Sequence, residues 1–341
     1  MANIMVNEAC NLRCPYCFAG EFVNKTQKEM TLEDFQKALN FVLSDDNDRQ
    51  VNIIGGEPLQ YTHINDVLRI SLEHHRSDKV MIFTNAVDLE RVEPDILSNP
   101  RFRMLVNCNS PEDTGERAFE KMRQNLLNFL HEYKGADRFR LSVNIYKPDF
   151  DHEYVIPLVQ DMGINTVRLS VSVPQNGDLQ GLTPLEYFRV MKQVVIRFIG
   201  AMLRCGAITG FDCNFIPGCV FTKDEREALM GTKEVLYSAL SKKFSNTFWE
   251  RVIFSQTNNC SPVIDILPDL RAIRCFGLSE YTKQDISSFR NIEALRKHYI
   301  SSVDSRACNI WSEDECEECV NRKLGSCSCG CLLFKAGQLF N

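Results

Sequence analysis

The chain has 341 residues, of which 44% are hydrophobic and 25% charged, a composition typical of a globular protein of about two domains. Its 39 basic and 45 acidic residues give a net charge of −6, which argues against nonspecific nucleic-acid binding, because phosphate contacts need a basic face. The sequence does not open on a basic segment followed by an apolar stretch, and its most apolar helical stretch, 190–203, is interrupted by Lys192 and Arg197. We therefore expect neither a signal peptide nor a membrane span.

Short apolar runs alternate with longer amphipathic runs over the first half of the chain. The short runs predict strands over 3–6, 51–54, 80–83, 104–106, 140–145 and 166–173. The amphipathic runs predict helices over 32–43, 64–74, 116–133 and 154–162. Strands separated by helices indicate βαβ units and a parallel sheet. Six repeats fit an α/β fold built as a partial (β/α)6 barrel, whose site opens at the carboxyl ends of its strands.

The sequence changes in texture after a long predicted helix over 184–204. Residues 207–341 are rich in cysteine and turn residues, and they show helical periodicity only near 224–240 and 292–299. We therefore predict a barrel over 1–206 and a cysteine-rich domain over 207–341. Metal sites would stabilise such a domain as much as a hydrophobic core does.

The fifteen cysteines are concentrated near the two ends of the chain. Three lie in the first 17 residues, only Cys108 and Cys205 lie in the next 195, and ten follow from Cys213 onward. A disulfide framework would spread cysteines through the fold, whereas clustered cysteines in a reducing compartment are typical metal ligands. We therefore expect a cytoplasmic protein that holds iron–sulfur clusters.

Cys10, Cys14 and Cys17 lie in the segment CNLRCPYC, directly after the first predicted strand. Three thiolates on one tight loop can hold three irons of a 4Fe–4S cube and leave the fourth iron open to a ligand. A zinc knuckle is the alternative. Zinc prefers a fourth His or Cys nearby, and none lies between Cys17 and His63.

This spacing, with Tyr16 before the third cysteine, resembles the signature of the radical S-adenosylmethionine (SAM) superfamily. Gly55-Gly56-Glu57-Pro58 follows the second strand and matches the family GGEP motif, which binds the methionine amino group of SAM. Glycines let a backbone approach a ligand closely, and Glu57 offers a carboxylate to an ammonium; a plain tight turn is the alternative. The resemblance implies a barrel fold and a reduced cluster that cleaves SAM to methionine and a 5′-deoxyadenosyl radical, which abstracts hydrogen from the substrate.

Polar residues at the ends of the next two strands extend the implied SAM site. Thr84 and Asn85 resemble a family TNG-type turn, with Ala86 in place of glycine. Asn107 and Asn109 end the fourth strand, where related enzymes place a hydroxyl or amide on the ribose.

Further candidates lie on the helix after the fourth strand and on the last two strands. Arg117 resembles the family arginine that pairs with the methionine carboxylate; a surface helix arginine is the alternative. Polar residues alternate on the fifth and sixth strands, so each pair shares one face, where they would meet SAM, the substrate or each other. These residues are Ser142, Asn144, Arg168 and Ser170.

The cysteines after residue 206 resemble the SPASM/twitch extension, which carries one or two auxiliary 4Fe–4S clusters. The resemblance rests on fourteen residues between Cys260 and Cys275 with Pro268-Asp269 among them, and on CEEC followed by CSCGC. Leu270 stands where the family has glycine. The preferred partition is Cys213, Cys219, Cys260 and Cys275 for one cluster and Cys316, Cys319, Cys327 and Cys331 for the other, with Cys308 or Cys329 as substitutes. A zinc ribbon of four thiolates is the alternative.

The remaining two cysteines, Cys108 and Cys205, are expected to be buried thiols, which are most often inert. Cys108 nevertheless ends a strand near the implied site, where a thiol could donate a hydrogen atom as an epimerase requires.

The resemblance implies a radical enzyme that matures a ribosomal peptide by crosslink, thioether or epimerisation. Phe276 stands where the sulfatase-maturing type has an aspartate base, so formylglycine formation is not expected. Because the chain starts at its first predicted strand, a peptide or protein substrate would be bound by the barrel or by a separate leader-binding protein. An electron donor of the flavodoxin or ferredoxin type is expected, and neither a nucleic acid nor a membrane is an expected partner.

Two alternatives remain open at this point. One is a radical SAM dehydrogenase of a small molecule. The other is an iron–sulfur electron carrier or scaffold, against which the GGEP segment argues because a carrier has no use for an ammonium-binding turn.

Overall fold

The structure is a computed structural model that describes residues 2–45, 48–174, 179–211, 216–225, 227, 260, 263–310, 313–324, 327 and 330–340. It contains two compact units, each built from two stretches of chain. Unit 1 comprises Met1–Arg140 and Pro262–Asp304, and unit 2 comprises Leu141–Ser261 and Ser305–Asn341. These units are defined by packing, and the division near residue 206 into a barrel and a cysteine-rich domain stays a prediction.

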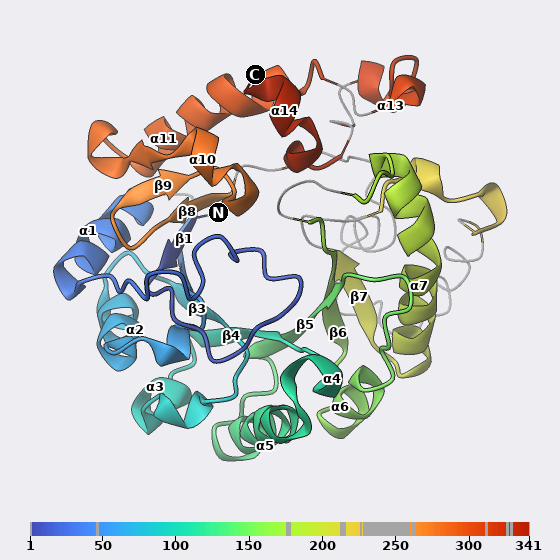
Figure 1. The fold of residues 1–341 in the computed structure, drawn as a ribbon. Helices are drawn as coiled ribbons and strands as arrows, with labels where there is room; N and C mark the ends of the chain where they lie inside the picture. The colour runs from blue at the N-terminus through green and yellow to red at the C-terminus, as the bar shows by residue number, and fades with distance from the viewer. Residues whose placement is uncertain are drawn as a thin grey trace. The chain divides into compact units, whose positions relative to one another are not determined.

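The centre of unit 1 is a mostly parallel sheet with the strand order β10-β9-β8-β1-β2-β3-β4 (Figure 1). Strands β8, β1, β2, β3 and β4 run parallel to one another, whereas β9 pairs antiparallel with both β8 and β10. The strands are β1 (Ala2–Met5), β2 (Gln50–Ile54), β3 (Lys79–Thr84), β4 (Phe102–Asn107), β8 (Ile264–Ile266), β9 (Arg271–Ile273) and β10 (Gln284–Asp285).

Helices of unit 1 follow the strands in alternation and cover the sheet (Figure 1). Helix α1 illustrates how the sequence forms these helices. Thr31 caps its first turn, because the Thr31 hydroxyl accepts a hydrogen bond from the Asp34 amide at 3.1 Å. Its apolar residues recur at helical spacing and are buried. The helices are α1 (Leu32–Val42), η1 (Pro58–Gln60), α2 (Ile64–Glu73), η2 (Leu89–Arg91), α3 (Pro94–Ser98), α4 (Pro111–Thr114), α5 (Glu116–Glu132), η4 (Phe276–Leu278), α10 (Ser279–Thr282), η5 (Ile286–Ser288), α11 (Ile292–Tyr299) and the π-helix η6 (Ile300–Asp304).

Unit 2 is built on the parallel strands β5, β6 and β7 and on the long helix α7. A capping box between Thr183 and Glu186, with Pro184 at the first helical position, starts α7. The elements are β5 (Phe139–Ile145, whose first two residues belong to unit 1), α6 (Val155–Asp161), β6 (Thr166–Val171), α7 (Pro184–Arg204), β7 (Ile208–Phe211), η3 (Gly218–Val220), α12 (Ser305–Ala307), η7 (Asp314–Cys316), α13 (Val320–Lys323), η8 (Leu332–Lys335) and α14 (Ala336–Leu339).

The core of unit 1 contains one buried polar row. Asn3 on β1 lies in register with Asn52 on β2 and with Asp265 on β8, and all three are buried. Asn3 Nδ2 donates to Asp265 Oδ1 at 2.6 Å, and burial raises the pKa of Asp265 to about 7. The row joins β8 to the first strand of the chain by side chains as well as by backbone.

The α/β class with a parallel sheet is confirmed, and the strands of the first half lie close to their predicted positions. The predicted strand over 166–173 is shorter than expected, because β6 ends at Val171. Four short strands, β7 to β10, were not expected from the sequence. The predicted helix over 292–299 is confirmed as α11, and the one over 224–240 lies mostly outside the described residues. Within the described ranges, every helix is too short or too polar to cross a membrane.

Candidate functional site

The loop that carries Cys10, Cys14 and Cys17 follows β1 and is folded by contacts to its own backbone. The Cys17 amide donates to the Cys14 carbonyl at 3.2 Å, and the Leu12 amide donates to the Cys10 sulfur at 3.4 Å. Asn24, at φ +57°, fixes the start of the loop. Its Oδ1 accepts from the Cys10 amide at 3.0 Å, and its Nδ2 donates to the Cys10 carbonyl at 3.2 Å. All three thiols are thus held on one ordered loop after β1.

Partial burial and mutual repulsion determine the chemistry of these thiols. Burial raises the pKa of Cys10 to about 11 and that of Cys14 to about 12, with repulsion from neighbouring thiolates adding to both. Burial also raises the pKa of Cys17. The metal-free thiols therefore hold their protons at neutral pH, and bound cations would favour their ionisation. In the described part of the chain, no three His, Cys, Asp or Glu side chains converge on one metal ion. A cluster binds one thiolate on each iron, and this soft donor set fits it.

The GGEP turn after β2 packs directly on the segment that leads into the cysteine loop. The Gly56 amide donates to the Asn7 carbonyl at 2.9 Å, and the Glu57 amide donates to the Ala9 carbonyl at 2.8 Å. A Cβ on Gly55 would lie 2.1 Å from Asn7 Oδ1, and one on Gly56 would lie 2.5 Å from the Ala9 carbonyl oxygen. The two glycines are thus explained by close approach of the chain's own backbone; ligand approach at this turn stays a prediction.

The Glu57 carboxylate is buried and holds the ends of β2 and β3 together. Oε1 accepts from the Leu59 amide at 3.0 Å and from the Thr84 hydroxyl at 2.6 Å, and Oε2 accepts from the Asn85 amide at 2.7 Å. Burial raises the pKa of Glu57 to about 7, although these hydrogen bonds oppose the rise. A carboxylate offers about four lone-pair positions. Three are used by described residues, and the fourth, on Oε2, suits an ammonium. Pro58 is buried at the first position of η1.

Thr84, Asn85 and Ala86 form a tight turn after β3, as the sequence predicts. Ala86 adopts φ +56°, the left-handed region that favours the glycine of the family pattern. The Ala86 amide donates to Thr84 Oγ1 at 2.9 Å, and Asn85 Nδ2 donates to Asn11 Oδ1 at 2.7 Å. The turn therefore contacts both Glu57 and the cysteine loop.

Asn109, just after β4, contacts the cysteine loop at two points. The Tyr16 hydroxyl donates to Asn109 Oδ1, and Asn109 Nδ2 donates to the Cys14 sulfur at 3.3 Å. Asn107 and Asn109 also line a small cavity beside the loop. Its lining residues are Leu12, Asn85, Val87, Asn107, Asn109, Thr114, Ala118, Phe119 and Met122.

Other predicted residues lie elsewhere. Arg117 is exposed in the first turn of α5 and does not line this cavity. Cys108 is 1% exposed and does not line the cavity either, and burial raises its pKa to about 12, so it is a protonated thiol at neutral pH. The hydrogen-donor role for Cys108 gains no support from this position.

The polar residues on β5 and β6 belong to unit 2. An Arg168 guanidinium nitrogen donates to the Ser142 hydroxyl at 2.6 Å, so these two side chains contact each other, as one of the alternatives from the sequence expected. Asn144 pairs in register with Ser170 on the neighbouring strand. Their roles toward SAM or substrate stay predictions.

The later cysteines are divided between the two units. Cys219, Cys319 and Cys327 lie near one another in unit 2, since repulsion from Cys327 and Cys319 adds to burial in raising the pKa of Cys219. Cys260 and Cys308, with Cys316 and Cys331, also belong to unit 2, and Cys275 belongs to unit 1. Cys213 and Cys329 lie outside the described residues. The partition into two clusters stays a prediction.

Phe276, directly after Cys275, packs against the cysteine loop. Its ring makes edge contacts with Phe18 at 5.1 Å and Phe22 at 5.9 Å between centroids. It belongs to a buried apolar cluster with Met5, Ile54 and Ile273 among others. The chain therefore places an apolar ring where the sulfatase-maturing pattern has a carboxylate base.

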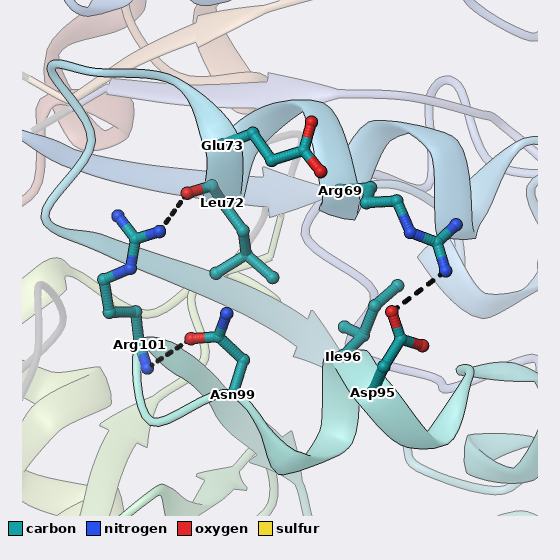
Figure 2. A pocket seen from close by; sticks show the side chains of 7 residues that line it. All are labelled: Arg69, Leu72, Glu73, Asp95, Ile96, Asn99 and Arg101. Atoms are coloured by element: carbon teal, nitrogen blue, oxygen red, sulfur yellow. Dashed lines mark hydrogen bonds and ion pairs between the residues drawn. The ribbon is translucent and has the colours of Figure 1, made fainter.

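A separate hollow of about 130 Å³ lies between α2, α3 and the start of β4 (Figure 2). Its two arginines are already paired: Arg69 with Asp95 at 3.0 Å, and Arg101 with the Ser77 carbonyl at 2.9 Å. We assign it no ligand.

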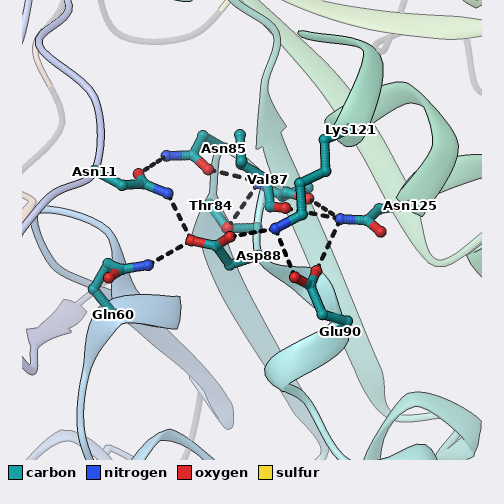
Figure 3. Close-up of polar contacts among 10 residues, drawn as sticks. Asn11, Gln60, Thr84, Asn85, Val87, Asp88, Glu90, Lys121 and Asn125 are labelled. Carbon is teal, nitrogen blue, oxygen red and sulfur yellow. Dashed lines mark hydrogen bonds and ion pairs between the residues drawn. The ribbon is translucent and has the colours of Figure 1, made fainter. Parts of the chain in front are cut away.

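Sequence reasoning missed a further group of polar residues beside the site. Asp88, Gln60 and Lys121 form hydrogen bonds with Asn11 or with one another (Figure 3). The only signal in the sequence was the position of Asn11 next to Cys10 and of Gln60 just after the GGEP turn.

Comparison with known proteins gives a consistent result. Residues 4–161 match the model of the Radical SAM superfamily. The PqqA peptide cyclase of Bradyrhizobium diazoefficiens is 24% identical over 96% of this chain and 80% of its own length. The GTP 3′,8-cyclase of Chlorobaculum tepidum is 36% identical over 26% of this chain and 26% of its own length.

Two solved structures share the fold over nearly the whole chain. Streptococcus suis SuiB bound to the precursor peptide SuiA is 16% identical, covers 97% of this chain and 71% of its own, and has a TM-score of 0.59. The structure of anSMEcpe with bound AdoMet and the Kp18Cys peptide is 13% identical, covers 99% of this chain and 95% of its own, and has a TM-score of 0.61. The match over residues 4–161 identifies a radical SAM domain in this chain, and the motifs and the fold agree with it.

Proposed function

We propose that this protein is a radical SAM enzyme that abstracts hydrogen from a peptide substrate in ribosomal peptide maturation. The observation that carries the proposal is the direct packing of the Glu57 turn on the segment that leads into the three-cysteine loop, through hydrogen bonds from the Gly56 and Glu57 amides to Asn7 and Ala9. An open iron and an ammonium-binding carboxylate on adjacent segments suit one ligand that bears an amino group and a second metal-binding group.

The residues of unit 1 supply the binding roles. Cys10, Cys14 and Cys17 would hold the cluster, and the free position on Glu57 Oε2 would accept the SAM ammonium. Asn7 Oδ1 is buried without a hydrogen-bond partner among described residues and lies against Gly55, so it offers a second acceptor beside that carboxylate.

The asparagine side chains that line the small cavity beside the loop are proposed to orient the rest of the cofactor. Asn85 and Asn107 present amides there, and Asn109 donates to the Cys14 sulfur. An N–H···S bond of this kind stabilises a thiolate ligand and raises the potential of a cluster. When bound, the cluster would supply the electron that cleaves SAM into methionine and a 5′-deoxyadenosyl radical. The role of the protein would be to hold SAM next to a substrate C–H bond.

The relatives support a peptide as the substrate. One is named for cyclising a peptide, and two solved structures of the same fold are described with bound peptides. The cysteines after residue 206 are proposed ligands of one or two auxiliary clusters, which would accept the second electron when a crosslink or thioether forms. A flavodoxin or ferredoxin-type donor and a leader-binding protein are proposed partners.

Deuterium transfer tests the proposal. The reconstituted enzyme is supplied with dithionite and SAM, and either with a peptide fraction or with a small-molecule fraction from cells grown in deuterated medium. The 5′-deoxyadenosine is then analysed by mass spectrometry.

A peptide substrate predicts deuterium in 5′-deoxyadenosine only with the peptide fraction. Deuterium only with the small-molecule fraction would replace the proposal by the small-molecule dehydrogenase. Absence of 5′-deoxyadenosine under all conditions would favour an electron carrier and overturn the proposal.

A further inference from the structure

The Asp88 carboxylate joins three segments of unit 1 that are far apart in sequence. It follows the β3 turn and is the residue before η2, yet its side chain makes no cap bond to that helix. Oδ2 accepts from Asn11 Nδ2 at 2.9 Å and from Gln60 Nε2 at 2.5 Å, and Oδ1 accepts from Lys121 Nζ at 2.7 Å (Figure 3). The side chain is therefore used for contacts between segments and not for its own helix.

Two of these contacts, those with Asn11 and Gln60, reach the candidate site. Asn11 is adjacent to Cys10 on the cysteine loop, and Gln60 lies in η1, where its amide donates to the Glu57 carbonyl at 2.9 Å. Asn85 donates to Asn11 Oδ1 at 2.7 Å, so the β3 turn and Asp88 hold the two ends of the same amide. One carboxylate thus links the cysteine loop, the GGEP turn and the β3 turn.

The charge on Asp88 is needed for this arrangement. Lys121 on α5 balances it, and Glu90 contacts the same ammonium at 2.6 Å. A neutral amide at position 88 has one acceptor oxygen and one NH₂ group. That NH₂ would face either the Lys121 ammonium or the two amide donors, so no orientation of an asparagine satisfies all three partners.

We propose that Asp88 is a positioning residue, which holds the Asn11 side of the cysteine loop against the GGEP turn before any cofactor binds. The ordering of the loop needs no assumption about the reaction. Only the expected effect on SAM affinity rests on the proposed function.

Hydrogen exchange of the metal-free protein tests the ordering. Asp88→Asn and Asn11→Ala should each speed amide exchange in residues 10–17 by about tenfold or more, because a hydrogen bond to a charged group contributes about 1.5 kcal/mol or more. Glu90→Gln is the matched control: it removes a carboxylate from the same lysine without touching the loop, and exchange there should stay within about twofold of the wild-type rate.

The double variant Asp88→Asn/Asn11→Ala separates positioning from general destabilisation. Because both single changes break the same contact, the double variant should exchange no faster in residues 10–17 than the faster single variant. Strand β2 should keep its protection in all variants. Multiplied effects in the double variant, or equal effects of Asp88→Asn and Glu90→Gln, would overturn the proposal.

A second readout uses the reconstituted protein. Asp88→Asn should weaken SAM binding about tenfold while the rate of 5′-deoxyadenosine formation at saturating SAM stays within about threefold. An equal fall in rate at saturating SAM would contradict a role in positioning. If the wild type fails to bind SAM, the proposed function fails, and the exchange data still decide the role of Asp88.

Discussion

Replacing Glu57 by glutamine should change how the stability of the metal-free protein depends on pH. The Glu57 carboxyl is 2% exposed and accepts hydrogen bonds from the Leu59 amide, the Thr84 hydroxyl and the Asn85 amide. Burial raises its pKa from the ordinary value of 4.5 to about 7. Glutamine keeps the shape of the side chain and removes the titration.

The direction of this pH dependence follows from which state of the protein binds the Glu57 proton. Between pH 4.5 and about 7 the native state holds this proton and the unfolded state releases it, so stability falls as pH rises through that window. At about 1.36 kcal/mol per pKa unit, the whole window is worth about 3 kcal/mol. About 2 kcal/mol of this lies between about pH 5 and about pH 7.5.

Urea unfolding of the metal-free protein at these two pH values measures the effect. The free energy of unfolding of the wild type should fall by about 2 kcal/mol more than that of Glu57→Gln between about pH 5 and about pH 7.5. Glu29→Gln is the matched control, because Glu29 also accepts from a backbone amide, that of Thr62 at 3.1 Å, but in an exposed contact. This control should follow the wild-type pH dependence. Equal losses for wild type and Glu57→Gln would refute the assignment of a raised pKa to this buried carboxyl.

Three further predictions concern the packing at Gly56, the backbone strain at Leu270 and the iron content of the protein. Gly56→Ala should lower the free energy of unfolding in urea by about 1–3 kcal/mol, because its Cβ would lie 2.5 Å from the Ala9 carbonyl oxygen. The control Gly210→Ala, whose Cβ would have nothing within 4 Å, should lower it by less than about 1 kcal/mol. Equal losses for the two variants would refute the close packing at Gly56. Leu270 adopts φ +62° in the turn between β8 and β9, a left-handed conformation that favours glycine. Leu270→Gly should therefore be more stable than Leu270→Ala by about 1 kcal/mol in thermal unfolding. The reverse order would contradict backbone strain at Leu270. Anaerobically reconstituted protein should contain about eight irons per chain with one auxiliary cluster or about twelve with two, and zinc in place of iron would contradict the cluster assignment.

Local sequence signals predicted the elements that form the site. Cys10, Cys14 and Cys17 are close in sequence, and part of the loop they define is held by local contacts to its own backbone and to Asn24. The GGEP turn was likewise placed correctly after β2. Its glycines were expected to make room for a ligand, but in this structure the segment from Asn7 to Ala9 occupies that space. Sequence alone cannot distinguish close approach of a ligand from close approach of the chain's own backbone, because both require a residue without a Cβ.

Long-range pairing could not be predicted in the same way. Strands β8 to β10 have two or three residues each, too few to show a period, and β8 pairs with β1 across more than 250 residues, as Asn3 and Asp265 show. Asp88 lies in an ordinary polar stretch, and its three partners come from three separate segments. Only the folded chain brings them to one carboxylate.

Formation of 5′-deoxyadenosine tests the central claim most directly, namely that the cysteine loop and the Glu57 turn are one radical-generating site. Anaerobically reconstituted protein is incubated with dithionite and SAM, and wild type is compared with Cys14→Ala and with the control Cys205→Ala. The account predicts 5′-deoxyadenosine from wild type and from the control, and none from Cys14→Ala. Undiminished product from Cys14→Ala, or none from wild type, would contradict it.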